Sequence, residues 1–142
     1  MKNILPRIAI VIGTLFLPHG VRACSCTCKP FGDGGPRAMA HLSAVVFVGE
    51  VTDVQGPTDA ESHKGYYGVG VTFRVEQYWK GVKSPVIVVH TRLWCCNPTL
   101  DKGRRYLVYA VGKKLETGCT RTRPITDADE DLRVLGAGRS FE

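Results

Sequence analysis

The sequence predicts a mainly β protein, a small closed or partly open barrel of about five strands with two short helices. Three observations favour this class. β-Branched and aromatic residues gather in short runs, and polar stretches rich in glycine and proline separate these runs. Strand-like segments do not alternate with helical ones, so a parallel sheet is not expected. The chain is long enough for one hydrophobic core but not for two, which suits a single small barrel.

The first segment of the chain, residues 1–23, has the pattern of a removable secretion signal. Two basic residues open it, a ten-residue apolar run follows at 8–17, and small residues end it at Ala23. The apolar run is too short to span a bilayer. We expect cleavage after Ala23, which begins the processed chain at Cys24 and leaves one domain, residues 24–142. We therefore expect a secreted protein, extracellular or periplasmic.

Strands are predicted from runs of β-branched and aromatic residues. We expect them at residues 44–51, 66–79, 85–91 and 104–111, with a short fifth strand around 116–122. Gly49 interrupts the first run and predicts a bulge or bend in that strand. In the second run Val69, Val71 and Phe73 alternate with polar residues, so one face of that strand is expected to be buried.

Two short helices are expected, one before the first strand and one near the end of the chain. The first covers residues 36–42 and carries proline in its first turn. For the second, Thr126 is predicted to be the N-cap and Asp129 to hold the capping-box position. Leu132 and Leu135 give this helix an apolar contact, and the glycine that follows suits its C-terminus.

Six cysteines in an exported chain predict disulfide bonds, because the exported compartment is oxidising. Three stand together at the start of the processed chain and three lie far along it: Cys24, Cys26 and Cys28, then Cys95, Cys96 and Cys119. Bonding the two vicinal cysteines to each other would be strained. We therefore expect each N-terminal cysteine to pair with a distant one, each bridge contributing about 4 kcal/mol. The N-terminus is then fastened to the body of the domain.

The charge of the processed chain is small. Three of the 19 basic residues lie in the signal segment, which leaves 16 basic against 13 acidic residues, a net charge of +3. The basic residues are scattered and no stacking motif surrounds them, so we expect no nucleic-acid partner. Exposed polar faces and strand edges account for these charges.

Recognisable catalytic motifs are missing from the sequence. There is no zinc-protease helix motif, no nucleophile elbow, no phosphate-binding glycine loop and no paired-carboxylate setting. His41, His63 and His90 stand alone, away from other ligand residues. A thiolate cluster at residues 24–28 is disfavoured because export favours disulfides. We therefore expect neither enzyme activity nor a bound cofactor.

Several short segments together resemble a known family. They run in order along the processed chain: Cys24-Ser25-Cys26, residues 46–51, Trp79-Lys80-Gly81, Cys95-Cys96, residues 106–110, Cys119-Thr120-Arg121-Thr122 and Asp131-Leu132. This set resembles the inhibitory domain of the tissue inhibitors of metalloproteinases, within the netrin-like group, and most closely its compact bacterial members.

The resemblance implies an OB-fold, a five-stranded barrel with short flanking helices. It also implies that Cys24 is bridged to Cys95 or Cys96, and that Cys26 is bridged to Cys119. A third bridge, from Cys28 to the remaining vicinal cysteine, is our extension of that pattern.

The function implied by the resemblance is inhibition of zinc metalloproteases. The α-amine and carbonyl oxygen of Cys24 would chelate the catalytic zinc of the protease, so Cys24 is a metal ligand only in that complex. Ser25 would enter the specificity pocket, with Cys26 and Thr27 as further contacts. Loops at 55–65 and 94–103 would flank this edge. The partner is a zinc metalloprotease, and the inhibitor itself is expected to be a monomer.

Two other interpretations remain open. In the first, the cysteines only strengthen a small barrel, which is a non-inhibitory binding module. In the second, Val21-Arg22-Ala23-Cys24 is a lipoprotein processing site and Cys24 carries lipid. Membrane association is expected only in that case, and acylation of the Cys24 amine would exclude zinc chelation.

Overall fold

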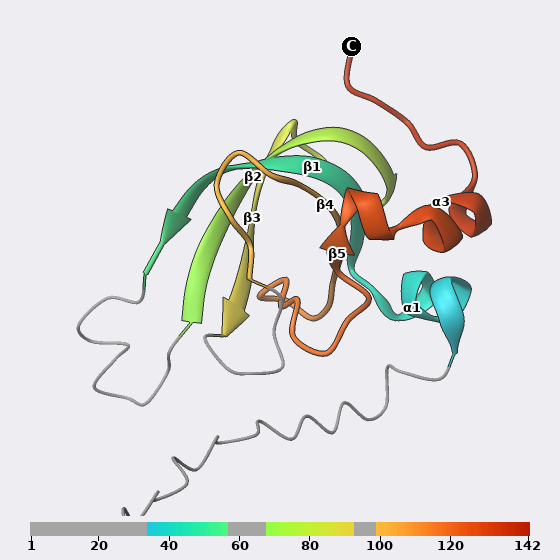
Figure 1. Ribbon diagram of the computed structural model, residues 1–142, viewed down its shortest axis with the longest axis horizontal. Helices are drawn as coiled ribbons and strands as arrows, with labels where there is room; N and C mark the ends of the chain where they lie inside the picture. Colours follow the sequence, from blue (N-terminus) through green and yellow to red (C-terminus); the bar gives the residue numbers. More distant parts are fainter. Residues whose placement is uncertain (1–33, 57–67, 93–98) are drawn as a thin grey trace, which may run out of the picture.

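The computed structural model describes residues 34–56, 68–92 and 99–142. Its strands form one antiparallel sheet of five strands in the order β3-β2-β1-β4-β5. Figure 1 shows this sheet curving beside two short helices. The mainly β class predicted from the sequence is therefore confirmed. The predicted signal cleavage and the domain start at Cys24 lie outside the described residues.

The described elements follow the predicted order closely. The helical elements are α1 (Gly35–Leu42), the single 3-10 turn η1 (Ile125–Asp127) and α3 (Asp129–Leu135). The strands are β1 (Val45–Gln55), β2 (Gly68–Lys80), β3 (Val86–Arg92), β4 (Arg105–Ala110) and β5 (Arg123–Pro124). The first four predicted strands are confirmed within these ranges. β1 continues past the predicted end at residue 51, because its polar second half still pairs with β2.

The sheet is organised around β1, which pairs with β2 on one side and β4 on the other. Its pairing with β2 shifts register at three points, one of them between Val48 and Gly49. A Cβ added at Gly49 would lie 2.7 Å from the carbonyl oxygen of Arg74 on β2. Only glycine therefore allows the two backbones to approach here, and the predicted irregularity at Gly49 is confirmed.

Two apolar clusters lie on the two faces of the sheet. The larger one gathers side chains from β1, β2, β3 and β4, and is built around Phe47, Phe73 and Tyr106. Their rings meet edge to face, with centroids 5.3 and 6.4 Å apart. The smaller cluster joins Val46 and Leu107 of the sheet to the helices. Adjacent residues of β1 thus enter different clusters, as expected for alternating side chains.

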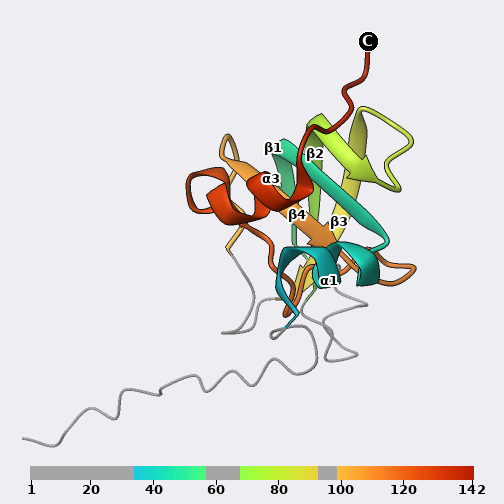
Figure 2. The same ribbon diagram turned by 90° about the vertical axis from the view of Figure 1, so that its right-hand side faces the viewer.

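Helices α1 and α3 cover the face of the smaller cluster, and Figure 2 shows them side by side in front of β4. Met39 of α1 is buried there, and Leu132 and Leu135 of α3 pack against the same cluster. The predicted helix at 36–42 and the predicted apolar contacts of the last helix are confirmed. Gly136 ends α3 with a φ of 70°, as the sequence indicates.

The prediction of a fifth strand around 116–122 is wrong. This segment is a loop with isolated bridges at Glu116, and the fifth strand is the two-residue β5, Arg123–Pro124. The reason lies in Thr122, whose hydroxyl accepts from the Tyr109 N–H at 2.9 Å and donates to the Tyr109 carbonyl at 3.0 Å. A side chain thereby satisfies β4 backbone groups that a strand would otherwise pair with.

The predicted cap of the last helix is also wrong. The N-cap is Ala128, and no side chain caps α3. Thr126 lies instead in η1, where its hydroxyl is 3.2 Å from a carboxylate oxygen of Asp127. The 3-10 turn brings the chain into α3 and replaces the side-chain cap. Acidic residues in the first turn of α3 still favour its N-terminus electrostatically.

Among the described residues, the sheet is not closed into a barrel. Two isolated bridges nevertheless place Glu116 between the edge strand β3 and the end of β4. One is a parallel bridge to His90, and the other is an antiparallel bridge to Val111. The barrel predicted from the sequence stays a prediction.

Candidate functional site

Most residues of the predicted inhibitory site lie outside the described part of the chain. This holds for the cleavage site, the proposed zinc-chelating residue, its neighbours and five of the six cysteines: Ala23, Cys24, Ser25, Cys26, Thr27, Cys28, Cys95 and Cys96. Their predicted roles stay predictions. Cys119 is the single predicted site residue among the described ones. It takes part in a disulfide bond. Which cysteine it pairs with also stays a prediction.

Cys119 lies in a short loop, residues 117–122, which we call the cysteine loop. Its backbone has a φ of 56°, in the left-handed region that non-glycine residues rarely adopt. Threonine hydroxyls hold the loop together. Thr120 donates to the carbonyl of Thr117 at 2.8 Å and lies 2.9 Å from the hydroxyl of Thr122. The unusual conformation of Cys119 is therefore supported on both sides by hydrogen bonds.

The cysteine loop is joined to the sheet at both ends. At its start, Thr117 is buried and its N–H donates to the carbonyl of His90 on β3 at 2.9 Å. At its end, the hydroxyl of Thr122 bonds both backbone groups of Tyr109 on β4. The disulfide anchor is thus fixed to two strands that are not neighbours in the sheet.

A buried ion pair holds the cysteine loop against α3. Asp131 of α3 is fully buried. Arg121 of the cysteine loop donates from Nε to one of its oxygens at 2.8 Å and from a terminal nitrogen to the other at 2.9 Å. The hydroxyl of Tyr109 donates to the same carboxylate at 2.9 Å, and Arg123 lies 3.7 Å away. Arg121 also reaches Glu130 at 3.0 Å. This two-pronged arginine contact is both strong and directional.

The pKa values in this cluster follow from its geometry. Burial alone would raise the pKa of Asp131, but hydrogen bonds from Arg121 and Tyr109 outweigh it and leave the pKa lowered. The hydrogen bond to Asp131 raises the pKa of Arg121. Burial first, and then the bond to Asp131, raise the pKa of the Tyr109 hydroxyl. The cluster therefore stays fully charged, with a neutral tyrosine, at neutral pH.

This cluster has a structural role. Asp131 is fully buried and both of its carboxylate oxygens accept hydrogen bonds from within the domain, so a substrate cannot reach it as a base. Within the described ranges, no three histidine, cysteine or acidic residues are grouped so as to hold a metal ion. Neither described helix has the length and apolar run that a membrane crossing needs.

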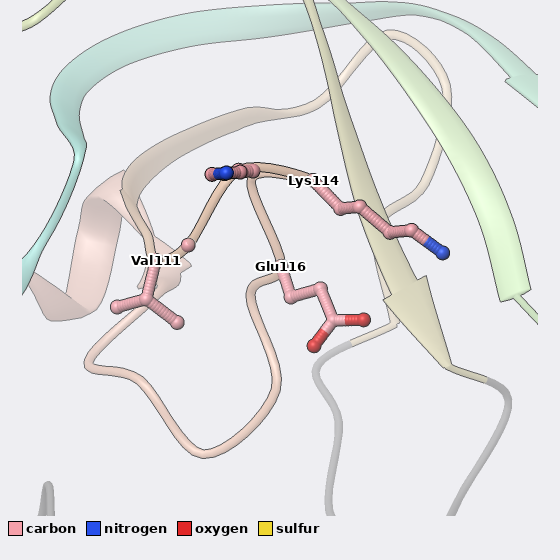
Figure 3. A pocket seen from close by; sticks show the side chains of 5 residues that line it. Val111, Lys114 and Glu116 are labelled. Atoms are coloured by element: carbon pink, nitrogen blue, oxygen red, sulfur yellow. The ribbon is translucent and has the colours of Figure 1, made fainter.

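Two shallow hollows lie on the surface of the described residues. One, of about 200 Å³, is formed by the turn after β4 and is lined by Val111, Gly112, Lys113, Lys114 and Glu116. Figure 3 shows the Lys114 side chain extending from this turn in the direction of β3. The other, of about 230 Å³, lies between the start of β4 and η1 and is lined by residues 103–105 and 124–126. Both are small for a cofactor site.

No protein-family model matches the chain, and no curated protein matches it.

Sequence reasoning missed the ion pair between Arg121 and Asp131. A signal for it is present in the last helix. Ala128, Leu132 and Leu135 mark its apolar side by their spacing, and Asp131 falls on that same side. An acidic residue at a buried helical position requires a cationic partner, and the arginines of residues 121–123 are the nearest ones before it in the sequence.

Proposed function

We propose that the processed chain inhibits zinc metalloproteases by presenting the α-amine and carbonyl oxygen of Cys24 to the catalytic zinc of the protease. One observation carries the proposal: Cys119 is disulfide-bonded in a loop that hydrogen bonds and a buried ion pair fix to the domain. In the proposed pairing, its partner is Cys26, two residues from the chelating residue. The N-terminus would then have a rigid point of attachment.

The proposed inhibition is ordinary coordination chemistry. A catalytic zinc keeps one position open for water, and this is the position that the inhibitor would take. The amine nitrogen and the carbonyl oxygen of Cys24 are separated by two carbons, so both can bind zinc in a five-membered ring. A free α-amine has a pKa of roughly 7.7–8, so it loses its proton easily near neutral pH. The zinc-bound water leaves, and the amine proton passes to solvent.

A rigid N-terminal segment would raise the affinity of such an inhibitor for its protease. Ordering a flexible segment on binding costs free energy, and fixing it beforehand removes that cost. The cysteine loop supplies such fixation, because Thr117 attaches it to β3 and Thr122 attaches it to β4. A bridge from Cys26 to Cys119 would pass this rigidity to the chelating residue.

We further infer that the sheet belongs to a closed OB-fold barrel. Two observations support closure. The N–H of His90 donates to the carbonyl of Leu115, and the N–H of Thr117 donates back to His90, which is the pattern of a short parallel pair. Glu116 also pairs with Val111 just beyond β4. These contacts support closure through the segment between β4 and the cysteine loop.

The direct test adds a single alanine before Cys24. We expect the processed protein to inhibit at least one member of a panel of purified zinc metalloproteases. The extended protein, and protein acetylated at the Cys24 amine, should both lose this inhibition. The matched control adds an alanine after Glu142, which should change nothing. Circular dichroism should show the same fold and melting temperature for all forms.

Two results would overturn the proposal. If the extended protein inhibits as well as the processed one, chelation by the amine is wrong. If correctly processed protein inhibits no protease of the panel, the domain is a binding module without inhibitory function. Ser25→Arg provides a second measure, because it should change which proteases are inhibited while leaving the amine intact.

A further inference from the structure

The outer edge of β3 carries backbone groups that point away from β2. His90 is one residue whose backbone groups point away from β2. Its N–H donates to the carbonyl of Leu115, and its carbonyl accepts from the N–H of Thr117, both on the side opposite β2. In an antiparallel pair, successive residues alternate between facing the partner strand and facing away from it. Val88 and Val86, two and four residues earlier, therefore present their backbone groups on the same outer side.

These groups are mostly unpaired within the described residues. The N–H of Val86 lies 3.3 Å from the hydroxyl oxygen of Ser84. No backbone hydrogen bond among the described residues reaches the carbonyl of Val86, or the N–H and carbonyl of Val88, from the outer side. Within the described residues, these three groups in a row have no backbone partner, which is the arrangement to which an added strand can bind.

The side chains along this edge are apolar and exposed. Val86 is 54% exposed and Val88 is 46% exposed, and both belong to the small group of large apolar residues that the described part leaves exposed. The register places them beside Arg74 and Thr72 on the outer face of β2. No charged residue interrupts the edge from Val86 to Val88, although charge is the usual protection of such an edge.

Both ends of the edge are basic. Lys83 precedes β3 and is exposed, and Lys113 is exposed in the turn that leads to the bond between Leu115 and His90. The hollow of about 200 Å³ formed by that turn is lined by Lys113 and Lys114 and by one acidic residue, Glu116, so its lining carries more positive than negative charge. A second copy of the chain fits poorly. Antiparallel pairing of two such edges about a twofold axis would bring Lys83 of one copy toward Lys113 of the other.

We propose that the outer edge of β3 binds an extended acidic segment of a partner protein as an additional strand. Backbone hydrogen bonds to Val86 and Val88 hold the segment, their side chains contact its apolar residues, and Lys83 and Lys113 select acidic ends. This surface is formed by described residues and does not depend on the proposed inhibition, so either proposal can fail alone.

The test uses the disulfide-bonded exported chain and a fluorescent probe peptide with alternating valine and threonine and two glutamates at each end. We expect saturable binding, with amide chemical-shift changes centred on Val86 and Val88. Val88→Pro removes the outward N–H but leaves the bonds to β2, as proline does on an edge strand. Losing one net hydrogen bond should weaken binding about fivefold or more.

Matched variants distinguish binding at the outer edge of β3 from non-specific hydrophobic binding elsewhere on the surface. Val88→Ser should weaken binding up to about fivefold, whereas Val54→Ser, at a valine 41% exposed on β1, should leave it unchanged. A probe ending in lysines should bind more weakly than the glutamate probe at low salt. Equal binding of Val88→Pro and the native chain, or of the two probes, would overturn the proposal. So would concentration-dependent dimerisation that Val88→Pro abolishes, because the edge would then serve a second copy.

Discussion

Replacing Asp131 with asparagine tests the buried ion pair that holds the cysteine loop against α3. The substitution keeps the size of the side chain and removes its charge. Arg121 then faces an amide group in place of one carboxylate oxygen, and only 16% of its side chain is exposed to water. Breaking a buried pair by removing one partner costs about 3–5 kcal/mol. We expect a loss of that size in the free energy of unfolding.

The size of the loss can be checked by thermal and urea unfolding. For a domain of this length, each kcal/mol lowers the melting temperature by roughly 4 °C, so Asp131→Asn should melt about 12–20 °C lower. Tyr109→Phe removes one hydrogen bond to the same carboxylate and should cost about 1.5–3 kcal/mol.

The control is an exposed ion pair on the sheet. Arg105 bonds Glu76 at 3.0 and 3.1 Å, with its side chain 52% exposed. Glu76→Gln should therefore cost less than about 1 kcal/mol. A loss for Asp131→Asn no larger than that of Glu76→Gln would refute the structural role assigned to Asp131.

Three further predictions concern acid stability, a turn and the disulfide. The lowered pKa of Asp131 contributes stability above its unfolded pKa of about 3.9, and this is lost as the pH falls through the folded value. Denaturant titrations at several pH values should thus show the difference between native and Asp131→Asn protein shrinking below about pH 4; a constant difference would contradict this. Gly81→Ala should be markedly destabilising, because φ is 68° and a Cβ would lie 2.0 Å from the carbonyl oxygen of Ala44, whereas Gly112→Ala, at φ 70° with open space, should show backbone strain alone. Cys119→Ser should lower the urea midpoint by an amount corresponding to about 2–5 kcal/mol, and an unchanged midpoint would show that the bridge is not structural.

Secondary structure could be predicted from the sequence wherever one residue type dominates a segment. The runs that became β1 to β4 are β-branched and aromatic, and burial of those side chains determines their strand structure. Gly49 indicated an irregularity because glycine weakens a strand interior and often marks a bulge or a close approach of another backbone. Pro36 likewise marked the first turn of α1.

Prediction failed where side chains replace backbone pairing. Thr122 bonds both backbone groups of Tyr109, so the chain before it needs no strand. Pro124 lies in β5 although proline argues against strands, which is tolerated because β5 is the edge of the sheet. Asp131 and Arg121 lie ten residues apart in sequence, and only the packing of α3 against the cysteine loop brings them together.

For the candidate site, the hypothesis of zinc chelation by Cys24 comes from the sequence, and the structure describes one residue of that site, Cys119. The predicted chelating residue and its neighbours, residues 24–28, lie outside the described part of the chain. Cys119 is described, disulfide-bonded and fixed to the sheet through Thr117 and Thr122. If Cys26 pairs with Cys119, this rigid loop would hold the N-terminus in one place before it binds a partner.

N-terminal sequencing combined with the intact mass of the exported protein tests the central claim most directly. Zinc chelation requires the molecule to begin at Cys24 with a free amine, and the proposed bridges require all six cysteines to be oxidised. We predict a mass equal to residues 24–142 without added groups and with three disulfides. A different first residue, an acylated amine or a lipid on Cys24 would contradict the claim and leave only the β domain standing.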